Sequence, residues 1–259
     1  MTELLTVPVK AVLTEIEEFL LDNILDYGII AGGFAAYLYN PQKKHSDIDL
    51  FAKEQVDSEA YDKLYHALGA KMSFWKKMKW RMTAEHPQLS KYNENVTLQA
   101  LNIYDYTKRG KPGHHSQVQL VTTVDKEDPR HSTAESILRS FDWNVCKASV
   151  LDKRTLLVDK QFIEDMEANR VTFRPYPPRK TMNDDYGWRL FKYVEFKGYD
   201  MPFKDMLTVY GLVSDKKKFY DQIFRSGHTI KNKNLLNFQS FIQMMNNNDP
   251  EWQSKQEAF

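Results

Sequence analysis

Two aspartates separated by one residue, Asp47 and Asp49, stand in a short apolar run with Ile48, Leu50 and Phe51. Side chains two residues apart on a β-strand project from the same face, so the two carboxylates are predicted to lie side by side while Ile48 and Leu50 enter the core. Neighbouring carboxylates repel each other unless a cation lies between them. Hard oxygen ligands of this kind suit Mg²⁺, which takes one or two carboxylates together with substrate phosphates. The spacing therefore predicts a site where a divalent cation meets a phosphate-bearing substrate.

A pair of glycines, Gly32 and Gly33, precedes these aspartates and joins two predicted elements. The apolar residues 28–31 predict a strand, and residues 34–39 predict a brief helix that ends before Pro41. Glycines at such a strand-to-helix turn let backbone N–H groups approach a phosphate at the positive end of the helix. A metal site and a phosphate-binding turn are therefore predicted close together.

The order of these features resembles the DNA polymerase β-like nucleotidyltransferase superfamily, in particular its minimal viral and phage-type members. The family signature is a Gly-Gly or Gly-Ser pair, a spacer, and then Asp-hydrophobic-Asp. Here Gly32, Gly33, Asp47 and Asp49 match it, and Ser46 completes the run Ser-Asp-Ile-Asp-Leu. The resemblance implies an α+β fold, with a nucleotidyltransferase-type mixed sheet flanked by helices and followed by a C-terminal helical domain. It also implies two Mg²⁺ ions, replaceable by Mn²⁺, at the aspartates, and an NTP bound at Gly32, Gly33 and Ser46.

Members of this family use a third carboxylate on a neighbouring strand, which bridges the metal and can accept the proton of the attacking hydroxyl. Gln119 occupies one position where this group would fall, but an amide is a weak Mg²⁺ ligand and no base. Asp142 is favoured instead, because residues 140–146, SFDWNVC, resemble the Phe-Asp-Phe segment of viral and phage-type members. We expect Asp142 on a strand over residues 141–148. In the alternative hypothesis, Asp142 only caps the end of the preceding helix.

A helix predicted over residues 184–197 offers cations for a triphosphate. Arg189, Lys192 and Tyr193 lie three and four residues apart, so they share one face of an α-helix. The run resembles the Arg-x-x-Lys-Tyr-x-x-x-Lys-Gly-aromatic helix beside the active cleft of related nucleotidyltransferases, which implies that the three residues bind a triphosphate and stack on a base. Two alternatives remain open: a charged helix that only packs, or phosphate contacts along the basic strand predicted at residues 72–83.

The elements that must position these residues follow from hydrophobic periodicity. Helical spacing predicts an amphipathic helix over residues 8–26, with Glu15, Glu17 and Glu18 on its solvent face. The remaining predictions are strands over 96–104, 116–124 and 155–159, a short helix over 132–139, and helices over 202–212, 214–225 and 235–246. Three prolines between residues 175 and 178 favour extended chain. Two domains are therefore predicted, 1–173 and 174–259.

Composition narrows the class of protein. The chain has 259 residues and a net charge of +1, from 36 cationic and 35 anionic side chains, which excludes a globally basic nucleic-acid-binding protein but not a local basic groove. The single cysteine, Cys146, excludes an internal disulfide framework and a cysteine zinc cluster. No apolar run is long enough to span a bilayer, and no signal-peptide pattern is present. A cytoplasmic protein without a membrane partner is expected, in the host cytoplasm if the source is viral.

Two functional hypotheses from different classes follow. The first is a metal-dependent nucleotidyltransferase that moves a nucleoside monophosphate from an NTP to an acceptor hydroxyl and releases pyrophosphate, with Asp47, Asp49 and Asp142 as catalytic and metal-binding residues. An RNA 3′ end is the favoured acceptor, and a protein or a small molecule remains open. The second is a catalytically inactive nucleotide- or RNA-binding protein of the same fold, with an antitoxin-like or host-interaction role. The group that faces Asp47 and Asp49 discriminates between the two.

Overall fold

A computed structural model of the protein describes residues 3–43, 45, 47–52, 65–66, 68, 80–84, 88–89, 96–105, 113–123, 133–175, 186–225, 227 and 229–247. By packing, the chain divides into two compact units, Met1–Met166 with Arg174–Pro177, and Glu167–Phe173 with Pro178–Phe259. The first unit is built on a β-sheet and the second is helical. The predicted α+β class, a mixed sheet with helices and a helical C-terminal part, is confirmed.

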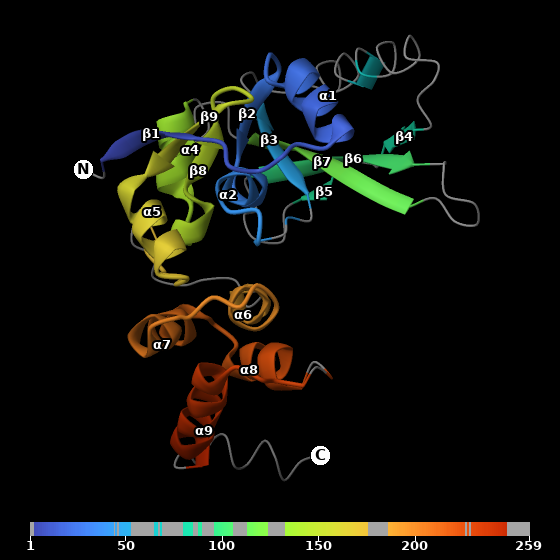
Figure 1. The fold of residues 1–259 in the computed structure, drawn as a ribbon. Coiled ribbons are helices and arrows are strands. Elements are labelled where there is room, and N and C mark those ends of the chain that lie inside the picture. Colours follow the sequence, from blue (N-terminus) through green and yellow to red (C-terminus); the bar gives the residue numbers. More distant parts are fainter. Residues whose placement is uncertain are drawn as a thin grey trace. The chain divides into compact units, whose positions relative to one another are not determined.

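One mixed sheet organises the first unit (Figure 1). Its described strands stand in the spatial order β1 (Leu4–Pro8), β9 (Thr155–Asp159), β8 (Ala148–Val150), β2 (Gly28–Ala31), β3 (Ile48–Ala52), β7 (Gly113–Thr123), β6 (Val96–Asp105) and β4 (Trp80–Ala84), with β5 (Gln88–Leu89) paired to β6. The pair β3 and β7 is parallel, and the other described pairs are antiparallel. The strands predicted over residues 28–31, 96–104, 116–124 and 155–159 are confirmed to within a few residues, whereas the edge strand β1 was not predicted.

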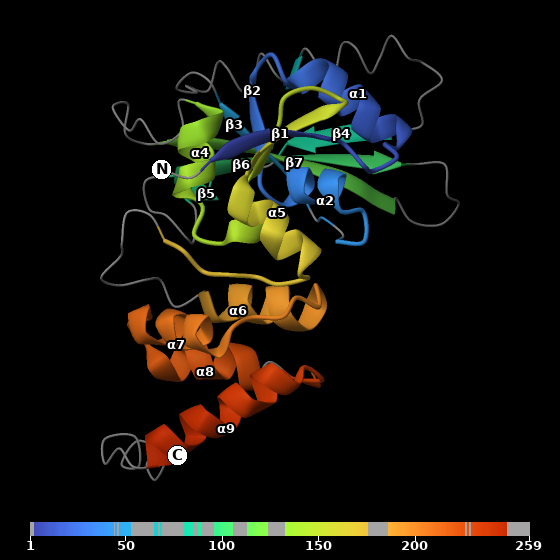
Figure 2. The same ribbon diagram turned by 60° about the vertical axis from the view of Figure 1, so that its left-hand side comes forward.

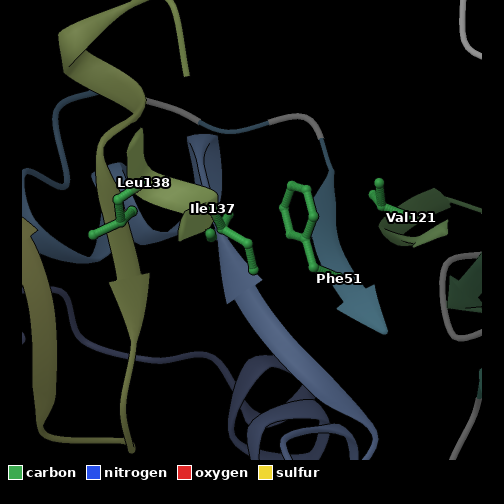
Figure 3. Packing of buried hydrophobic residues seen from close by; sticks show 5 residues of the cluster. Phe51, Val121, Ile137 and Leu138 are labelled. Atoms are coloured by element: carbon green, nitrogen blue, oxygen red, sulfur yellow. The ribbon is translucent and has the colours of Figure 1, made fainter. Parts of the chain in front are cut away.

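The strand β3 alternates between the two faces of the sheet, as predicted. Ile48 and Leu50 are fully buried on one face, and Asp49 on the other face is half-buried. The face that carries Asp49 becomes apolar further along the strand, where α4 (Ala134–Ser140) packs on it (Figure 3). This apolar cluster contains Ala31, Phe51, Val121, Ile137 and Leu138. Asp49 therefore lies beside a packed core.

The helix α1 (Glu15–Ile24) is shorter than the predicted helix over residues 8–26. Thr14 is its N-cap, and the side chains of Thr14 and Glu17 form a reciprocal capping box. Val12, which lies within the predicted helix but before α1, is 89% exposed. Glu17, expected in solvent, is buried. The apolar periodicity continues before the capping signal, into the end of β1 and the turn after it. Periodicity alone therefore places the start of the helix too early.

Other helices of the first unit are α2 (Gly33–Tyr39), the 3₁₀-helix η2 (Asn144–Cys146) and α5 (Lys160–Glu167). The helix α2 matches the predicted brief helix, and α4 matches the helix predicted over residues 132–139. The helix α5 was not predicted. It follows β9 without a loop, and Asp159 accepts a hydrogen bond from Gln161 N–H at 2.8 Å at its start.

The second unit contains α6 (Tyr186–Phe191), the π-helical segment η3 (Lys192–Phe196), α7 (Phe203–Leu212), α8 (Lys216–Phe224) and α9 (Lys233–Asn247), drawn from orange to red in Figure 2. These bounds confirm the four predicted C-terminal helices, except that the first one changes to a π-helix at Lys192. Aromatic rings fill the core of this unit, with Phe219 and Phe238 fully buried. No described helix in either unit is long and apolar enough to cross a bilayer.

Residues 167–173 belong to the helical unit although they precede the predicted domain boundary. Val171 N–H donates to the carbonyl of Asp200 at 2.7 Å, and Phe173 N–H donates to the buried Asp205 carboxylate at 3.2 Å. Arg174 then returns to the sheet unit, where its N–H donates to the Asp142 carbonyl at 2.7 Å. The predicted domains, 1–173 and 174–259, remain a prediction.

Candidate functional site

The carboxylate of Asp49 lies next to the Gly32 turn, at the start of α2. Gly32 has a φ of +87°, a conformation that favours glycine. A Cβ placed on Gly32 would stand 3.4 Å from Asp49 Oδ2 and 3.5 Å from Phe141 Cζ. These are ordinary contact distances, so the positive φ and not crowding favours glycine at this position, and the carboxylate and the ring both lie next to the turn. The predicted proximity of the acidic strand and the glycine pair is confirmed for Asp49 and Gly32.

Asp47 lies directly before β3 and is half-buried, like Asp49. Ile48 between them is fully buried, and Asp49 has the strand phase that the sequence predicts, whereas the shared face of Asp47 remains a prediction. Ser46, predicted to contact the nucleotide, lies outside the described residues. Two half-buried carboxylates flanking a buried side chain form a hard, anionic donor set that fits Mg²⁺ or Mn²⁺.

The two glycines differ in what their N–H groups can bind. Gly32 N–H donates to the carbonyl of Ala148 in β8 at 2.9 Å, so this N–H is already used to hold the turn to the sheet. Gly33 begins α2, and the first N–H groups of a helix have no acceptor within the helix. A Cβ on Gly33 would meet no heavy atom within 4 Å. The backbone available for a phosphate therefore begins at Gly33, whereas the sequence analysis assigned the phosphate to both glycines.

Gln119 is the register neighbour of Asp49 on the parallel strand β7. The position of Gln119 is one of the two at which the family resemblance implies a third carboxylate. The amide Nε2 of Gln119 donates to Gln117 Oε1 at 3.1 Å, so the neighbour of Asp49 on this side is a neutral, hydrogen-bonded amide.

Asp142 does not lie on a strand, and the predicted strand over residues 141–148 is wrong. The segment contains a bend, the helix η2 and then β8, which begins only at Ala148. Apolar and polar residues alternate in this segment, which is typical of a strand with one buried face. In the fold, however, Asp142, Trp143 and Asn144 are all buried. Phe141, not Asp142, is the C-cap of α4. Asp142 follows the ring that packs on Gly32, but its place in the metal site remains a prediction.

A buried cation, Lys147, stands near Asp142 and was not singled out from the sequence. Lys147 is only 6% exposed. Burial lowers the pKa of its ammonium group, while the carboxylates of Asp159 and Asp142 attract the ammonium and raise that pKa. The negative charge of Asp142 is therefore partly compensated by Lys147, so this carboxylate does not depend on a metal ion alone for charge compensation.

Glu17 and His45 form a second arrangement that the sequence analysis missed. His45 Nε2 lies 3.2 Å from Glu17 Oε1. Burial raises the pKa of Glu17, but the hydrogen bonds from His45 and Thr14 outweigh this effect and hold the pKa below its ordinary value. The spacing of Thr14 and Glu17, Thr-x-x-Glu, is a capping-box signal that could have placed the helix start correctly.

Arg189, Lys192 and Tyr193 are half-buried residues of the second unit. Apolar residues anchor this segment in the helical unit, because Leu190 is fully buried and Val194 is 1% exposed. The α-helical spacing fails at Lys192, where η3 begins and Lys197 N–H donates to the Lys192 carbonyl at 3.0 Å.

In this geometry Arg189 and Tyr193 have separate neighbours. The guanidinium of Arg189 lies 5.6 Å from the centre of the Tyr186 ring, and Lys197 Nζ lies 5.6 Å from the centre of the Tyr193 ring. Their role toward a nucleotide remains a prediction.

Among the described residues, no group of three or more His, Cys, Asp or Glu side chains is arranged to hold a metal ion. The donor chemistry that fits a divalent cation is the pair Asp47 and Asp49. The strand register fixes the face of Asp49, and Asp47 lies directly before the strand. Mg²⁺ commonly completes its coordination with substrate phosphates and water.

Comparison with known proteins gives little at the sequence level. No protein-family model and no curated protein matches the chain. Among solved structures, the chain is similar to a crystal structure described as that of a candidate nucleotidyltransferase from H. pylori. The sequences are 12% identical, 87% of this chain and 89% of the other are covered, and the TM-score is 0.35.

Proposed function

We propose that the protein is a metal-dependent nucleotidyltransferase that moves a nucleoside monophosphate from an NTP to an acceptor hydroxyl and releases pyrophosphate. The observation that supports this most strongly is the proximity of Asp49 to the Gly32 turn, where Asp49 Oδ2 lies 3.4 Å from the point at which a Cβ on Gly32 would stand. It brings one carboxylate of an acidic pair to a glycine turn that opens a helix. A carboxylate pair beside exposed backbone donors can bind a metal-bound triphosphate, because the metal and the N–H groups contact different oxygens.

In this proposal, Asp47 and Asp49 hold Mg²⁺, for which Mn²⁺ can substitute, and Asp142 is the third carboxylate of a two-ion site. A divalent cation bound there would neutralise charge on the phosphates and favour ionisation of the attacking hydroxyl. The N–H groups that begin at Gly33 would bind the β- and γ-phosphates, with Ser46 beside them.

Asp142 would accept the proton of the acceptor hydroxyl, and its burial suits a base that must be shielded from water. Arg189 and Lys192 would hold the triphosphate, and Tyr193 would stack on the base. An RNA 3′ end is the favoured acceptor, because the reaction needs a free hydroxyl and an RNA strand carries one at its 3′ terminus. A protein or small-molecule hydroxyl would use the same chemistry.

The test is to incubate the protein with each α-³²P-labelled NTP, Mg²⁺ and total RNA, and then to locate the label. Label in RNA, together with released pyrophosphate, supports the proposal and identifies the preferred base. Label in protein or in a small molecule would retain the reaction class and change the acceptor. No pyrophosphate with any NTP or acceptor fraction, in Mg²⁺ or Mn²⁺, would contradict it.

A second function is favoured by the neighbours of the acidic pair. Asp49 has the neutral amide of Gln119 beside it, and Asp142 has the buried cation Lys147 nearby. This set also fits a catalytically inactive protein that binds a nucleotide or RNA on the same fold. Tight NTP or RNA binding without pyrophosphate release in the experiment above would establish this alternative.

A further inference from the structure

Asp47 lies directly before the described strand β3, whereas Asp49 lies within it. The described strand β3 begins at Ile48, and Asp49 pairs with Ala31 on one side and Gln119 on the other. Asp47 belongs instead to the end of the loop that follows α2. A metal ligand on a loop must be held by other contacts, because each freely rotating residue costs about 1–2 kcal/mol to order.

His45, two residues before Asp47, is held on two sides. Its ring lies 4.8 Å from the ring centre of Phe34, edge to face at 75°, and 4.8 Å from that of Tyr37. Its Nε2 lies 3.2 Å from Glu17 Oε1. The side chain of His45 is 14% exposed and that of Glu17 is 6% exposed. This is a buried contact between a loop and a helix 28 residues earlier in the chain.

The two oxygens of Glu17 have different partners. Oε2 accepts from Thr14 N–H at 2.7 Å and from Thr14 Oγ1 at 2.9 Å, which closes the capping box of α1. Oε1 contacts His45. The first set fixes the carboxylate to the helix, so the second contact ties the loop to a rigid element. Capping α1 requires only Oε2, and the Oε1 contact is therefore available for another purpose.

We propose that Glu17 and His45 are positioning residues that hold Asp47 in place for the metal. The inference rests on the proposed function, and it adds two residues that do not themselves touch the metal or the substrate. Outer contacts of this type commonly change metal affinity by about 10–100-fold when they are removed, because they orient the ligands without binding the ion. The rings of Phe34 and Tyr37 determine where His45 lies, and Glu17 determines which way its Nε2 points.

The test is titration of the full chain with Mn²⁺, with free Mn²⁺ measured by electron paramagnetic resonance. The variant His45→Phe keeps an aromatic ring between Phe34 and Tyr37 but loses the contact with Glu17, and we expect it to bind Mn²⁺ about tenfold or more weakly. The variant His45→Gln retains an N–H donor for Glu17, and we expect it to restore most of the affinity.

Thr14→Ala is the matched control, because it removes the hydroxyl from the capping box and leaves the Glu17–His45 contact. We expect Thr14→Ala to lower the midpoint of thermal unfolding while Mn²⁺ affinity stays at the wild-type value. Wild-type affinity in His45→Phe, or an equal loss in Thr14→Ala, would overturn the positioning role and leave the proposed function standing. Absence of Mn²⁺ binding in Asp49→Asn and in the wild type alike would overturn both.

Discussion

Asp49 is the residue on which the proposed chemistry depends most, because it combines strand register with contact at the Gly32 turn. We expect Asp49→Asn to abolish nucleotide transfer, since an amide is a weak Mg²⁺ ligand. Without metal, the variant should be as stable as the wild type or slightly more stable, because repulsion from Asp47 is relieved. Pyrophosphate release and urea unfolding measure the two effects. Loss of cooperative unfolding would show instead that Asp49 is structural.

Gly32 and Gly33 can be separated by the same substitution. Gly32→Ala forces a side chain onto a φ of +87° beside Asp49 Oδ2, and we expect it to lower the free energy of unfolding by about 1–3 kcal/mol. Gly33→Ala adds a Cβ into open space at the start of α2, so stability should be unchanged or raised by up to about 1 kcal/mol. Equal losses in the two variants, measured by urea denaturation, would contradict the assignment of strain to Gly32.

The buried Glu17 carboxylate makes stability depend on acid. Because the pKa of Glu17 in the folded protein lies below its ordinary value, its contribution is present above the unfolded pKa and is lost as pH falls through the lowered folded pKa. We expect the wild type to lose its stability advantage over Glu17→Gln as pH is lowered below the ordinary glutamate pKa of about 4.3 and through the lower pKa of folded Glu17. Chemical denaturation of both proteins across this range checks the prediction. An advantage that grows on acidification would have the wrong sign and would contradict it.

At the scale of elements, the helix α6 and its π-helical continuation η3 carry a prediction about the nucleotide. If Arg189 contacts a triphosphate, Arg189→Ala should weaken NTP binding by about 1.5–3 kcal/mol, the size of a lost charge-assisted hydrogen bond, without much change in stability. Arg225→Ala is a matched control, because the guanidinium of Arg225 also lies over a tyrosine ring, 5.9 Å from the centre of Tyr220.

Isothermal titration with a non-hydrolysable NTP compares the two arginine variants. Equal binding by both variants and the wild type would assign α6 to packing. The phosphate contacts would then have to be sought along the basic residues 72–83, which lie outside the described residues except for the start of β4.

Local patterns predicted the elements that carry the site, and long-range contacts were needed for the rest. The glycine pair, the apolar strands and the Asp-Ile-Asp phase are local signals, and α2, β2 and β3 follow them. The burial of Glu17 could not be predicted from helical spacing, because its partner His45 is brought there only by the fold. The place of Asp142 was also beyond local patterns. The residues around it alternate between apolar and polar as in a strand, whereas the fold buries them consecutively in a bend and a 3₁₀-helix.

At the scale of the whole molecule, we expect a chain ending at Pro178 to lose transfer although the three aspartates remain. The structure adds a second expectation for this truncated chain. It retains residues 167–173 without their partners, and Val171 and Phe173, which are 0% and 2% exposed in the full chain, lose their cover from the helical unit. Binding of the dye ANS should therefore rise relative to the full protein. Transfer at the wild-type rate by the truncated chain would show that the helical unit takes no part in the reaction.

The chain passes from the sheet unit to the helical unit at residues 167–173 and returns to the sheet unit at Arg174. This path sets the order in which contacts can form during synthesis on the ribosome. Phe173 leaves the ribosome 32 residues before Asp205, whose carboxylate accepts its N–H. At translation rates of about 5–20 residues per second, this segment waits roughly 2–6 s for its partner. During this time Arg174 N–H can already donate to the Asp142 carbonyl, so the sheet unit can form while Val171 and Phe173 are still exposed. The nascent chain therefore offers a chaperone a brief, defined target at Val171 and Phe173, which disappears once the helices have been made.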